Sequence, residues 1–378
     1  MLVSHTTSIN LSLFYMHHFL DTPSLKQWFS REKRELPWRQ FPTPYQVWIS
    51  EVMLQQTQAA VVIPYFEKWM EQFPSIESLA EAALDQVIKA WEGLGYYSRA
   101  RNLHAGARYI VQHLGGRLPQ DPEELSKIKG LGPYTIGAIR SFAFHHKAAA
   151  VDANVIRVLC RYFLLEEDIA KPKTVQHIRQ IAETILPEEE PWVVAEALIE
   201  LGATVCTRNP QCRRCPLRAS CAALLHGKAD KLPYKSRKIT IQALFRGVAI
   251  VHSAGHLLVK RGVQGSIMSD LHEFPYLEGE QQQIADPAAC GELLSRHIED
   301  ELGLRVEFDQ VLPAEAQAFT RYRVTLQPSL YTCYAMPPVE GCQWLSIAAL
   351  QQLAFSSGHR RIFQSIVGIL AKGARPCV

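Results

Sequence analysis

The hydrophobic pattern changes once along this chain of 378 residues. From about Ser24 to Leu225, apolar residues recur mostly at the spacing of an amphipathic helix. After a polar, basic connector the pattern becomes that of strands, with a helix expected over 295–303. Because a chain of this length usually forms two domains, the change predicts a mainly α-helical half before about residue 235 and an α+β half after it. The expected strands cover 239–253, 256–262, 304–312 and 323–336.

The expected organisation has four segments. Residues 1–22 form a leader of uncertain order, in which Met16 is an alternative start. A helical domain covers 23–227, a basic linker covers 228–239, and an α+β domain covers 240–378. The leader lacks the basic head and cleavage pattern of a signal peptide, and no apolar run approaches the roughly 20 residues that span a bilayer. We therefore expect a cytoplasmic monomer without membrane contact, associated with the nucleoid if it is bacterial.

The net charge gives little information about partners, but the local charge does. The formal charge is +3, from 40 basic and 37 acidic residues, and this value neither requires nor excludes a polyanionic partner. From Cys206 to Thr240, however, nine Lys or Arg stand against one acid, Asp230. Such a segment is either a solvated linker face or a surface that contacts phosphates.

Two helix starts are clear in the first half. Thr43 caps a helix whose first residue is Pro44, and Gln46 is placed to close a capping box. Asp121 and Pro122 begin a second helix, which we expect to run to about residue 128.

A tight glycine turn follows this second helix. The turn contains Gly130 and Gly132, and Pro133 begins the next helix. The unpaired N–H groups at that helix start carry positive partial charge and suit a phosphate, and glycines allow a ligand to approach the backbone closely. Glycine turns also join helices for purely structural reasons, so the turn alone does not decide between the two roles.

Several motifs in the first half resemble one enzyme superfamily. KIKGLGPYTIGAI, at 127–139, resembles the helix–hairpin–helix of the DNA glycosylases that include endonuclease III. VDANVIRVL, at 151–159, supplies the aspartate that this superfamily carries after the hairpin. WISEVMLQQTQ and GLGYYSRARNLH resemble one branch, the MutY-type adenine DNA glycosylases. The resemblance runs from about Leu36 to Cys221 and continues more weakly beyond, and it implies a six-helix module plus an iron–sulfur module, followed by an α+β Nudix-like domain.

Two carboxyl groups are the implied catalytic residues. Cleaving an N-glycosidic bond needs a proton for the leaving base and a negative charge near the cationic sugar, and two carboxyl groups can divide these roles. The resemblance gives the first role to Glu51 and the second to Asp152. Val47, Trp48 and Leu54 are turn neighbours of Glu51 on the expected helix, so burial would raise its pKa. A position at a helix start should help to keep Asp152 ionised. The alternatives are a salt-bridged helix residue and a simple cap.

Tyr134 occupies the place where the lyase-active relatives carry a lysine nucleophile. A phenol cannot form a Schiff base, so we expect a monofunctional glycosylase that leaves an abasic site. Lys129 and Lys147 lie nearby in the sequence and allow weak adventitious strand cleavage.

The resemblance also implies residues that handle the base and the DNA, because an enzyme acting on a base in duplex DNA must extrude it. Ala153 departs from the family, which usually has glycine at this position. Gln56 follows Glu51 by five residues and would project from another face of the same helix. The implied roles are insertion into the stack for Gln56 and Tyr96, lining of the adenine pocket for Arg39 and Glu196, support of Asp152 for Asn154 and Tyr134, and phosphate binding for Gly130 and Gly132.

The second half resembles the Nudix-like domain with which MutY-type proteins recognise 8-oxoguanine. The sequence at 296–304 echoes the Nudix pattern, but His297 replaces its first glutamate, and Gln282 and Ala288 replace an upstream Gly and Glu. A Mg²⁺ site needs those carboxylates, so we expect this domain to have the Nudix fold without Nudix hydrolase activity. The lesion-reading loop corresponds to Phe319, Thr320 and Arg321, where the family has Phe-Ser-His.

Four cysteines lie within CTRNPQCRRCPLRASC, separated by five, two and five residues. Nine cysteines in a cytosolic chain argue against a disulfide framework. Four thiolates suit either Zn²⁺ or an iron–sulfur cube, and the spacing alone does not choose. The resemblance implies a [4Fe–4S] cluster, with a first gap one residue shorter than in the family; its ligands would be Cys206, Cys212, Cys215 and Cys221, and Arg208, Arg213, Arg214 and Arg218 would contact the DNA backbone.

The sequence therefore predicts a base-excision-repair enzyme. Its substrate would be double-stranded DNA with adenine opposite 8-oxoguanine or guanine, and the reaction would be hydrolysis of the N-glycosidic bond of that adenine. Two alternatives remain: an endonuclease III-like glycosylase for oxidised pyrimidines, and a metal-dependent DNA-binding regulator without catalysis.

Overall fold

The computed structural model describes residues 19–40, 42–236, 240–262 and 268–373. The chain forms two compact units, the first Met1–Ala80 with Ala105–Lys238 and the second Glu81–His104 with Ile239–Val378. The limits of the domains expected from the sequence, 23–227 and 240–378, remain a proposal. Most of the expected leader, with its alternative start, lies outside the described residues, as do two cations of the basic segment, at 237 and 238.

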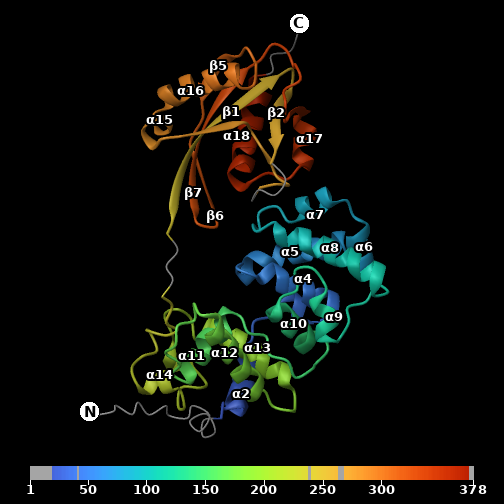
Figure 1. Ribbon diagram of the computed structural model, residues 1–378, viewed down its shortest axis with the longest axis vertical. Coiled ribbons are helices and arrows are strands. Elements are labelled where there is room, and N and C mark those ends of the chain that lie inside the picture. The colour runs from blue at the N-terminus through green and yellow to red at the C-terminus, as the bar shows by residue number, and fades with distance from the viewer. Residues whose placement is uncertain (1–18, 41, 237–239, 263–267, 374–378) are drawn as a thin grey trace, which may run out of the picture. The chain divides into compact units, whose positions relative to one another are not determined.

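Helices make up the first unit, and their starts follow local signals (Figure 1). Thr43 caps α4 with the predicted capping box, and Asp121 caps α9 by accepting bonds from two backbone N–H groups. Helix α9 ends at Ser126, slightly before the predicted end. The elements are α2 (Thr22–Glu32), α3 (Pro37–Gln40), α4 (Pro44–Leu54), α5 (Ala59–Gln72), α6 (Ile76–Glu81), α9 (Pro122–Ser126), α10 (Pro133–Ala138), η1 (Ile139–Ala143), α11 (Ala153–Tyr162), α12 (Pro172–Ile185), α13 (Pro191–Thr204), η2 (Cys212–Arg214) and α14 (Ala222–Leu225). Helices α7 (Leu84–Ala90) and α8 (Ser98–His113) complete the helical half of the sequence.

The core around α11 fixes the start of that helix. Helix α11 is strongly amphipathic and buries Val155, Val158 and Leu159, while α13 buries Leu198 and Leu201 in the same cluster. Because an apolar stripe at helical spacing must pack against a partner, the two helices hold each other in register. The first residue of α11 is thereby fixed relative to α13.

A mixed sheet forms the centre of the second unit (Figure 1). Strands β1 and β7 pair in parallel along their length, and the sheet order is β3-β2-β1-β7-β5. Side chains on β1 alternate between two cores: Val248 and Ile250 pack with α17 and α18, and Ala249 and Val251 pack with α15 and α16. The strands are β1 (Gln242–Ser253), β2 (His256–Arg261), β3 (His272–Glu273), β4 (Tyr276–Gly279), β5 (Glu307–Val311), β6 (Glu315–Phe319), β7 (Tyr322–Thr332) and β8 (Cys342–Ser346), and the helices are α15 (Gln281–Ala285), α16 (Pro287–Asp300), α17 (Ile347–Gln352) and α18 (Ser357–Gly373).

The fold class is confirmed, whereas some element bounds differ. Helix α16 begins at Pro287, eight residues before the predicted start, because Asp286 accepts a bond from the backbone N–H of Ala288. Strand β6 was not predicted, and it pairs with β7 through a two-residue turn at 320–321. The predicted strand over 323–336 ends at Thr332.

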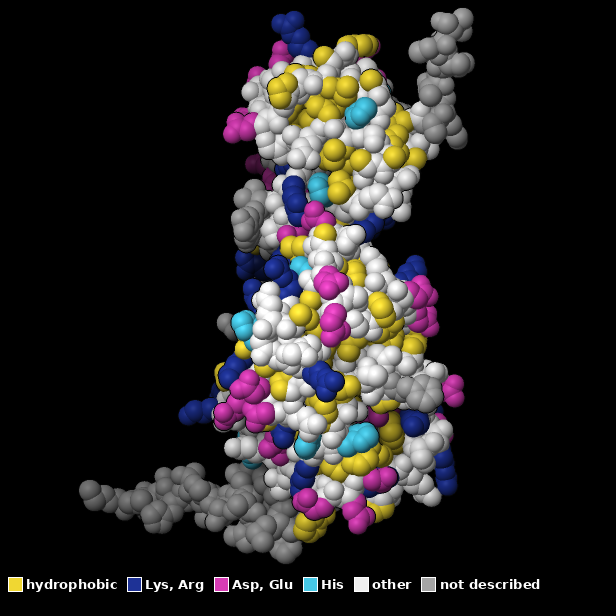
Figure 2. Space-filling model, turned by 90° about the vertical axis from the view of Figure 1, so that its right-hand side faces the viewer, with side chains coloured by type: hydrophobic (Ala, Val, Ile, Leu, Met, Phe, Trp, Pro, Cys, Tyr) yellow, Lys and Arg dark blue, Asp and Glu magenta, His cyan; other side chains and the backbone are white. Residues whose placement is uncertain are grey.

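Two general properties of the described residues concern membrane spans and surface charge. No helix within the described residues is long and apolar enough to cross a bilayer. Figure 2 shows one face of the molecule, on which Lys and Arg side chains are interspersed with Asp and Glu side chains. This mixture agrees with the small net charge of the whole chain.

Candidate active site

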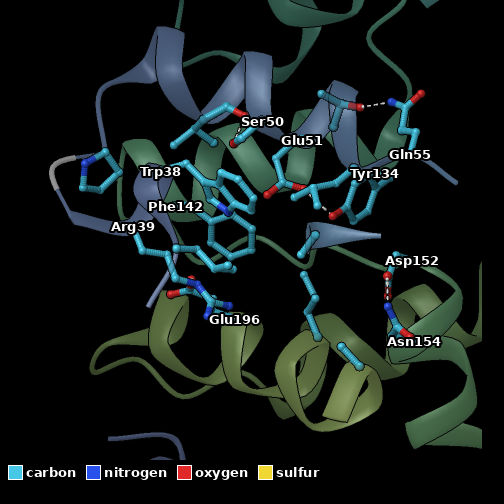
Figure 3. A pocket seen from close by; sticks show the side chains of 18 of the residues that line it. Trp38, Arg39, Ser50, Glu51, Gln55, Tyr134, Phe142, Asp152, Asn154 and Glu196 are labelled. Carbon is cyan, nitrogen blue, oxygen red and sulfur yellow. Dashed lines mark hydrogen bonds and ion pairs between the residues drawn. The ribbon is translucent and has the colours of Figure 1, made fainter. Parts of the chain in front are cut away.

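A cavity of about 1330 Å³ opens in the first unit (Figure 3). Its walls come from α2, α3, α4, the turn before α10, the start of α11, and α13. Nine of the residues singled out in the sequence line it: Arg39, Glu51, Gln56, Gly130, Gly132, Tyr134, Asp152, Asn154 and Glu196. The cavity thus gathers both implied carboxylates with the residues implied to bind the base.

Glu51 is buried in helix α4 and is 6 % exposed. The helix buries seven consecutive residues, from Val47 to Met53, so its carboxyl has little contact with water. Burial is the main reason that the pKa of Glu51 is raised to about 7; the hydrogen bond from Tyr134 opposes the rise, and the negative charges of Asp152 and Glu196 add to it. The expectation of a buried carboxyl with a raised pKa is confirmed, and Glu51 carries a proton in a substantial fraction of molecules at neutral pH.

Tyr134, which the resemblance implies as a support of Asp152, makes its hydrogen bond to Glu51. Tyr134 is the second residue of α10. Its hydroxyl points at Glu51 and donates a hydrogen bond to Oε2 of the carboxyl (Figure 3). Burial, followed by the charges of Glu51 and Asp152, raises the pKa of Tyr134 well above its ordinary value. The phenol therefore stays protonated and is a permanent hydrogen-bond donor to the carboxyl.

Asp152 is the N-cap of α11, as the sequence predicts. Its Oδ1 accepts from the backbone N–H of Val155 at 2.8 Å, and its Oδ2 accepts from Nδ2 of Asn154 at 2.7 Å. The bond from the helix start favours the ionised carboxylate, as expected, and the sequence did not show the opposing effect of burial. Burial raises the pKa of Asp152, although both hydrogen bonds and the charge of Arg157 oppose the rise.

Asn154 is held by a second layer of contacts. Nη2 of Arg157 donates to Oδ1 of Asn154 and to the carbonyl of Gly202, both at 2.7 Å, and its Nε donates to the carbonyl of Cys206 at 2.7 Å. Because Oδ1 accepts from a guanidinium, the amide nitrogen must face Asp152. A Cβ at Gly202 would lie 2.6 Å from Cβ of Asn154, so α13 packs against the asparagine without space for a side chain.

Arg39 is held between two glutamates on α13. Its Nε donates to Oε1 of Glu196 at 2.5 Å, and its Nη2 donates to Oε2 of Glu200 at 2.9 Å. Glu200 is fully buried and also accepts from Nε of Arg34 at 2.7 Å. Glu200 was not predicted as a site residue, although its position one turn after Glu196 on an otherwise apolar helix was a usable signal.

Gln56 does not share the helix of Glu51. Helix α4 ends at Leu54, and Gln56 follows it with a positive φ of 59°. Nε2 of Gln55 donates to Oγ1 of Thr135 at 3.2 Å and joins the end of α4 to α10 (Figure 3). The turn after the helix, and not a second helical face, directs Gln56 toward the cavity.

The glycine turn leaves the start of α10 open. Gly130 has φ 91°, and Gly132 is the N-cap of α10 without any side-chain capping bond. A Cβ at Gly132 would meet nothing within 4 Å, so the backbone there faces open space. The N–H groups at the start of α10 are therefore accessible to a ligand.

The predicted residue Tyr96 and the predicted reading loop belong to the second unit. Tyr96 is 47 % exposed, has a positive φ of 49°, and is not among the described residues that line the cavity. Phe319 ends β6, and Thr320, with φ 48°, and Arg321 form the turn into β7. The predicted reading loop is therefore the tip of a β-hairpin.

The four cysteines of the loop are all free and partly buried. The pKa of Cys215 is raised to about 12, first by burial; the backbone N–H of Leu217 opposes the rise, and the other three thiols of the loop add to it, so the four thiols interact electrostatically. Arg161 is 2 % exposed, and its Nη1 lies 3.3 Å from Sγ of Cys206.

The four thiols form a donor set that suits either a single Zn²⁺ or an iron–sulfur cluster. Among the described residues, no group of three or more His, Cys, Asp or Glu side chains is arranged to hold a metal ion.

Replacing Glu200 tests the support of Arg39. Burial by itself raises the pKa of Glu200, but Arg34 and Arg39 outweigh it, and the net pKa is lowered. We expect Glu200→Gln to reduce the free energy of unfolding at pH 7 by about 2 kcal/mol, because it breaks a buried pair whose Arg34 is partly exposed.

The lowered pKa fixes the sign of the pH dependence. The stabilisation is present above the ordinary pKa of 4.5 and is lost as pH falls through the lower folded value. Urea unfolding at pH 7 and at progressively lower pH should show the difference between Glu200→Gln and wild type shrinking below 4.5. The exposed Glu183→Gln is the control, and an equal loss in both variants would contradict the prediction.

Comparisons with known proteins agree with this geometry. Residues 49–187 match the family described as HhH-GPD superfamily base excision DNA repair protein, and residues 247–365 match the NUDIX domain. A solved structure of a thermostable thymine-DNA glycosylase is similar with a TM-score of 0.50 and 26 % identity, over 54 % of this chain and 94 % of that chain.

Curated relatives carry the name adenine DNA glycosylase. The mouse protein is 42 % identical over 223 residues, which are 56 % of this chain and 43 % of the mouse protein. This chain spans less than half the length of the mouse, rat and human relatives. The protein of Buchnera aphidicola subsp. Acyrthosiphon pisum is 31 % identical over 71 % of this chain and 77 % of its own length. The chain matches both family models, and its sequence is similar to most of the length of one such relative. It therefore belongs to the MutY-type adenine DNA glycosylase family.

Proposed function

We propose that this chain is a monofunctional adenine DNA glycosylase. It hydrolyses the N-glycosidic bond of adenine mispaired with 8-oxoguanine or guanine in double-stranded DNA. The observation that carries the proposal is the pairing of two unlike carboxyl groups in one cavity: Glu51 is buried with a pKa near 7, and Asp152 is held by two hydrogen bonds. Such a pair divides the roles of acid and charge stabiliser.

Glu51 acts as the general acid. The Tyr134 hydroxyl already donates to Oε2, so the proton of the neutral carboxyl resides on Oε1. A base bound in the cavity receives that proton as the glycosidic bond breaks, and leaves as a neutral species. A pKa near the working pH is the most effective value for such an acid.

Asp152 stabilises the sugar as it becomes cationic. Its oxygens accept from Val155 and Asn154, and each retains a lone pair that can face the sugar. The cap and the asparagine fix the carboxylate before the reaction, so no reorganisation is needed when charge develops. Water then completes the hydrolysis.

Arg39 and Glu196 bind the base edge. Arg39 is fixed by Glu200 and Glu196, and Oε1 of Glu196 is occupied by the guanidinium. A carboxylate oxygen accepts from an exocyclic amino group, which adenine has. This pair therefore favours adenine over a base that presents a carbonyl at the same position.

Absence of a lysine at position 134 supports hydrolysis over lyase chemistry, because a phenol forms no Schiff base. This argues against the endonuclease III-like alternative. Lys26 and Lys33 also line the cavity, so borohydride trapping with substrate DNA is the direct test. Efficient covalent capture of DNA would contradict a monofunctional enzyme.

Replacing Glu51 tests the function. Purified protein should release adenine from a duplex with adenine opposite 8-oxoguanine, revealed by alkali cleavage at the abasic site. Glu51→Gln should reduce the rate by about 10²- to 10⁴-fold with DNA binding retained. Because the protonated form is required, the single-turnover rate should fall as pH rises above about 7. The exposed Glu67→Gln is the control, and a wild type that binds DNA without releasing adenine would support a non-catalytic regulator.

The second unit reads the 8-oxoguanine opposite the adenine. The hairpin tip at Thr320 and Arg321 is the proposed reading element, with a hydroxyl and a guanidinium as donors. We expect no Nudix-type hydrolase activity from this unit, since His297 stands where a Nudix enzyme has a carboxylate.

Substitution of the hairpin tip tests this reading. The doubly substituted Thr320→Ala, Arg321→Ala protein should lose about tenfold of its preference for adenine opposite 8-oxoguanine over adenine opposite guanine, because base-specific donors supply such discrimination. Single-turnover rates on the two duplexes give the ratio. Arg296→Ala, exposed on α16, is the control. An unchanged ratio would reject the reading role.

We also propose that Cys206, Cys212, Cys215 and Cys221 hold a [4Fe–4S] cluster. The cluster would brace the loop that presents four arginines to the DNA backbone, and bond cleavage would not depend on it. The electrostatic interaction among the four thiols and the membership of the glycosylase family support this choice.

Metal analysis tests the cluster. Protein purified without oxygen should contain about four irons per chain and little zinc. Cys212→Ser should lower the iron content, whereas Cys342→Ser, in the second unit, should leave it unchanged. A colourless preparation with one zinc per chain would overturn the proposal.

A further inference from the structure

Segment Glu81–His104 is tied to the C-terminal elements of the second unit through Glu92. The carboxylate of Glu92 accepts from Nε and Nη2 of Arg360 at 2.7 and 3.1 Å, and from the backbone N–H of Phe355 at 2.9 Å. Arg360 lies on α18, and Phe355 lies just before that helix. One carboxylate thus binds a side chain and a main-chain group from the same end of α18.

The Glu92–Arg360 pair is well placed to be strong. The two side chains are only 16 % and 15 % exposed. The guanidinium of Arg360 also lies over the rings of Phe355 and Phe363, at 4.7 and 5.4 Å from their centroids. A bidentate ion pair that packs against aromatic rings has a fixed geometry, and water screens its electrostatic attraction only weakly.

Other polar contacts extend this attachment along the segment. Nζ of Lys89 donates to the carbonyl of Leu353 at 3.0 Å. Near the segment's two ends, Asp85 pairs with Arg261 at 2.6 Å and Arg101 pairs with Asp270. The segment is therefore held at its centre and toward both ends.

The turn that carries Tyr96 begins directly after Glu92. It is stiffened from within, since Nε1 of Trp91 and Nη2 of Arg99 both donate to the carbonyl of Gly95, at 3.0 and 3.1 Å. Tyr96 itself is exposed and has a positive φ, so it projects from a rigid turn. The segment continues covalently into the first unit at both ends.

We propose that Glu92 is a positioning residue that fastens the Tyr96 turn to the lesion-reading unit, so that recognition of 8-oxoguanine is transmitted to the turn that enters the DNA. The inference rests on the proposed function. Glu92 touches neither base nor sugar, and it acts through the placement of Tyr96. Loss of the contact removes the gain in rate that 8-oxoguanine confers and leaves the basal reaction on adenine opposite guanine.

Kinetics of Glu92 and Arg360 variants test the proposal. Glu92→Gln and Arg360→Gln should each lower the ratio of single-turnover rates, 8-oxoguanine duplex over guanine duplex, by about tenfold, a common size for coupling between linked sites. The double variant should lose no more than either single one, because both act through one contact. Arg360→Lys keeps the charge and should recover part of the ratio. Glu292→Gln, from an exposed pair on α16, is the control.

Hydrogen exchange in the free protein separates this inference from the proposed function. In Glu92→Gln, amide exchange should rise together in 93–97 and in 353–360, whereas wild type protects both. If wild type released no adenine, the proposed function would fail, and the exchange measurement would still decide whether Glu92 joins the two segments. An unchanged rate ratio in a folded Glu92→Gln protein, or faster exchange on only one side, would overturn the proposal.

Discussion

Burial of one carboxyl group is the constraint on which the first unit depends. A helix that buries seven residues in succession cannot keep Glu51 in water, and the cost of an isolated charge there is offset by protonation and by the Tyr134 hydroxyl. The hairpin before α10 must then bring Tyr134 to the carboxyl, and α11 must begin where Asp152 faces the same space. The positions of three elements thus follow from the chemistry of one side chain.

A second buried carboxyl group, that of Glu200, is kept charged, whereas that of Glu51 is readily protonated. Glu200 is as inaccessible as Glu51, yet two guanidinium groups keep it charged, and its pKa falls where that of Glu51 rises. The difference arises from the partners, since Glu51 meets a neutral phenol and Glu200 meets Arg34 and Arg39. One unit therefore contains an acid able to donate a proton and an anion able to hold a cation.

Local chemistry was predictable from the sequence, and long-range contacts were not. The caps at Thr43, Asp121 and Asp152 depend on residues two or three positions away, so their signals are contained in short motifs. The bond from Tyr134 to Glu51 spans 83 positions, and the bond from Arg34 to Glu200 spans 166. No spacing rule reaches across such distances, so the partner of Tyr134 and the role of Glu200 became visible only in three dimensions.

The raised pKa of Asp152 and the contacts of segment Glu81–His104 both depend on packing that the sequence does not show. The helix start was visible in the sequence, but the depth of burial that outweighs it depends on how α11 packs against α13. Segment Glu81–His104 reads as helical like its neighbours, and nothing in its periodicity indicates that its charges pair with residues near 261, 270 and 360. Packing between distant segments decided both outcomes.

The close approach at Gly202 has a consequence for how sequence variation in such a chain should be interpreted. Glycine there permits α13 to press against the asparagine that orients the aspartate, and a single added methyl would meet backbone and side-chain atoms within 3.0 Å. A glycine-to-alanine substitution there changes no charged or reacting group, so by residue type it is conservative. A substitution at Gly202 would nevertheless displace Asn154 and so misalign the carboxylate that faces the sugar. The loss of activity that a variant causes in this protein therefore need not depend on how close the changed residue lies to a recognisable motif.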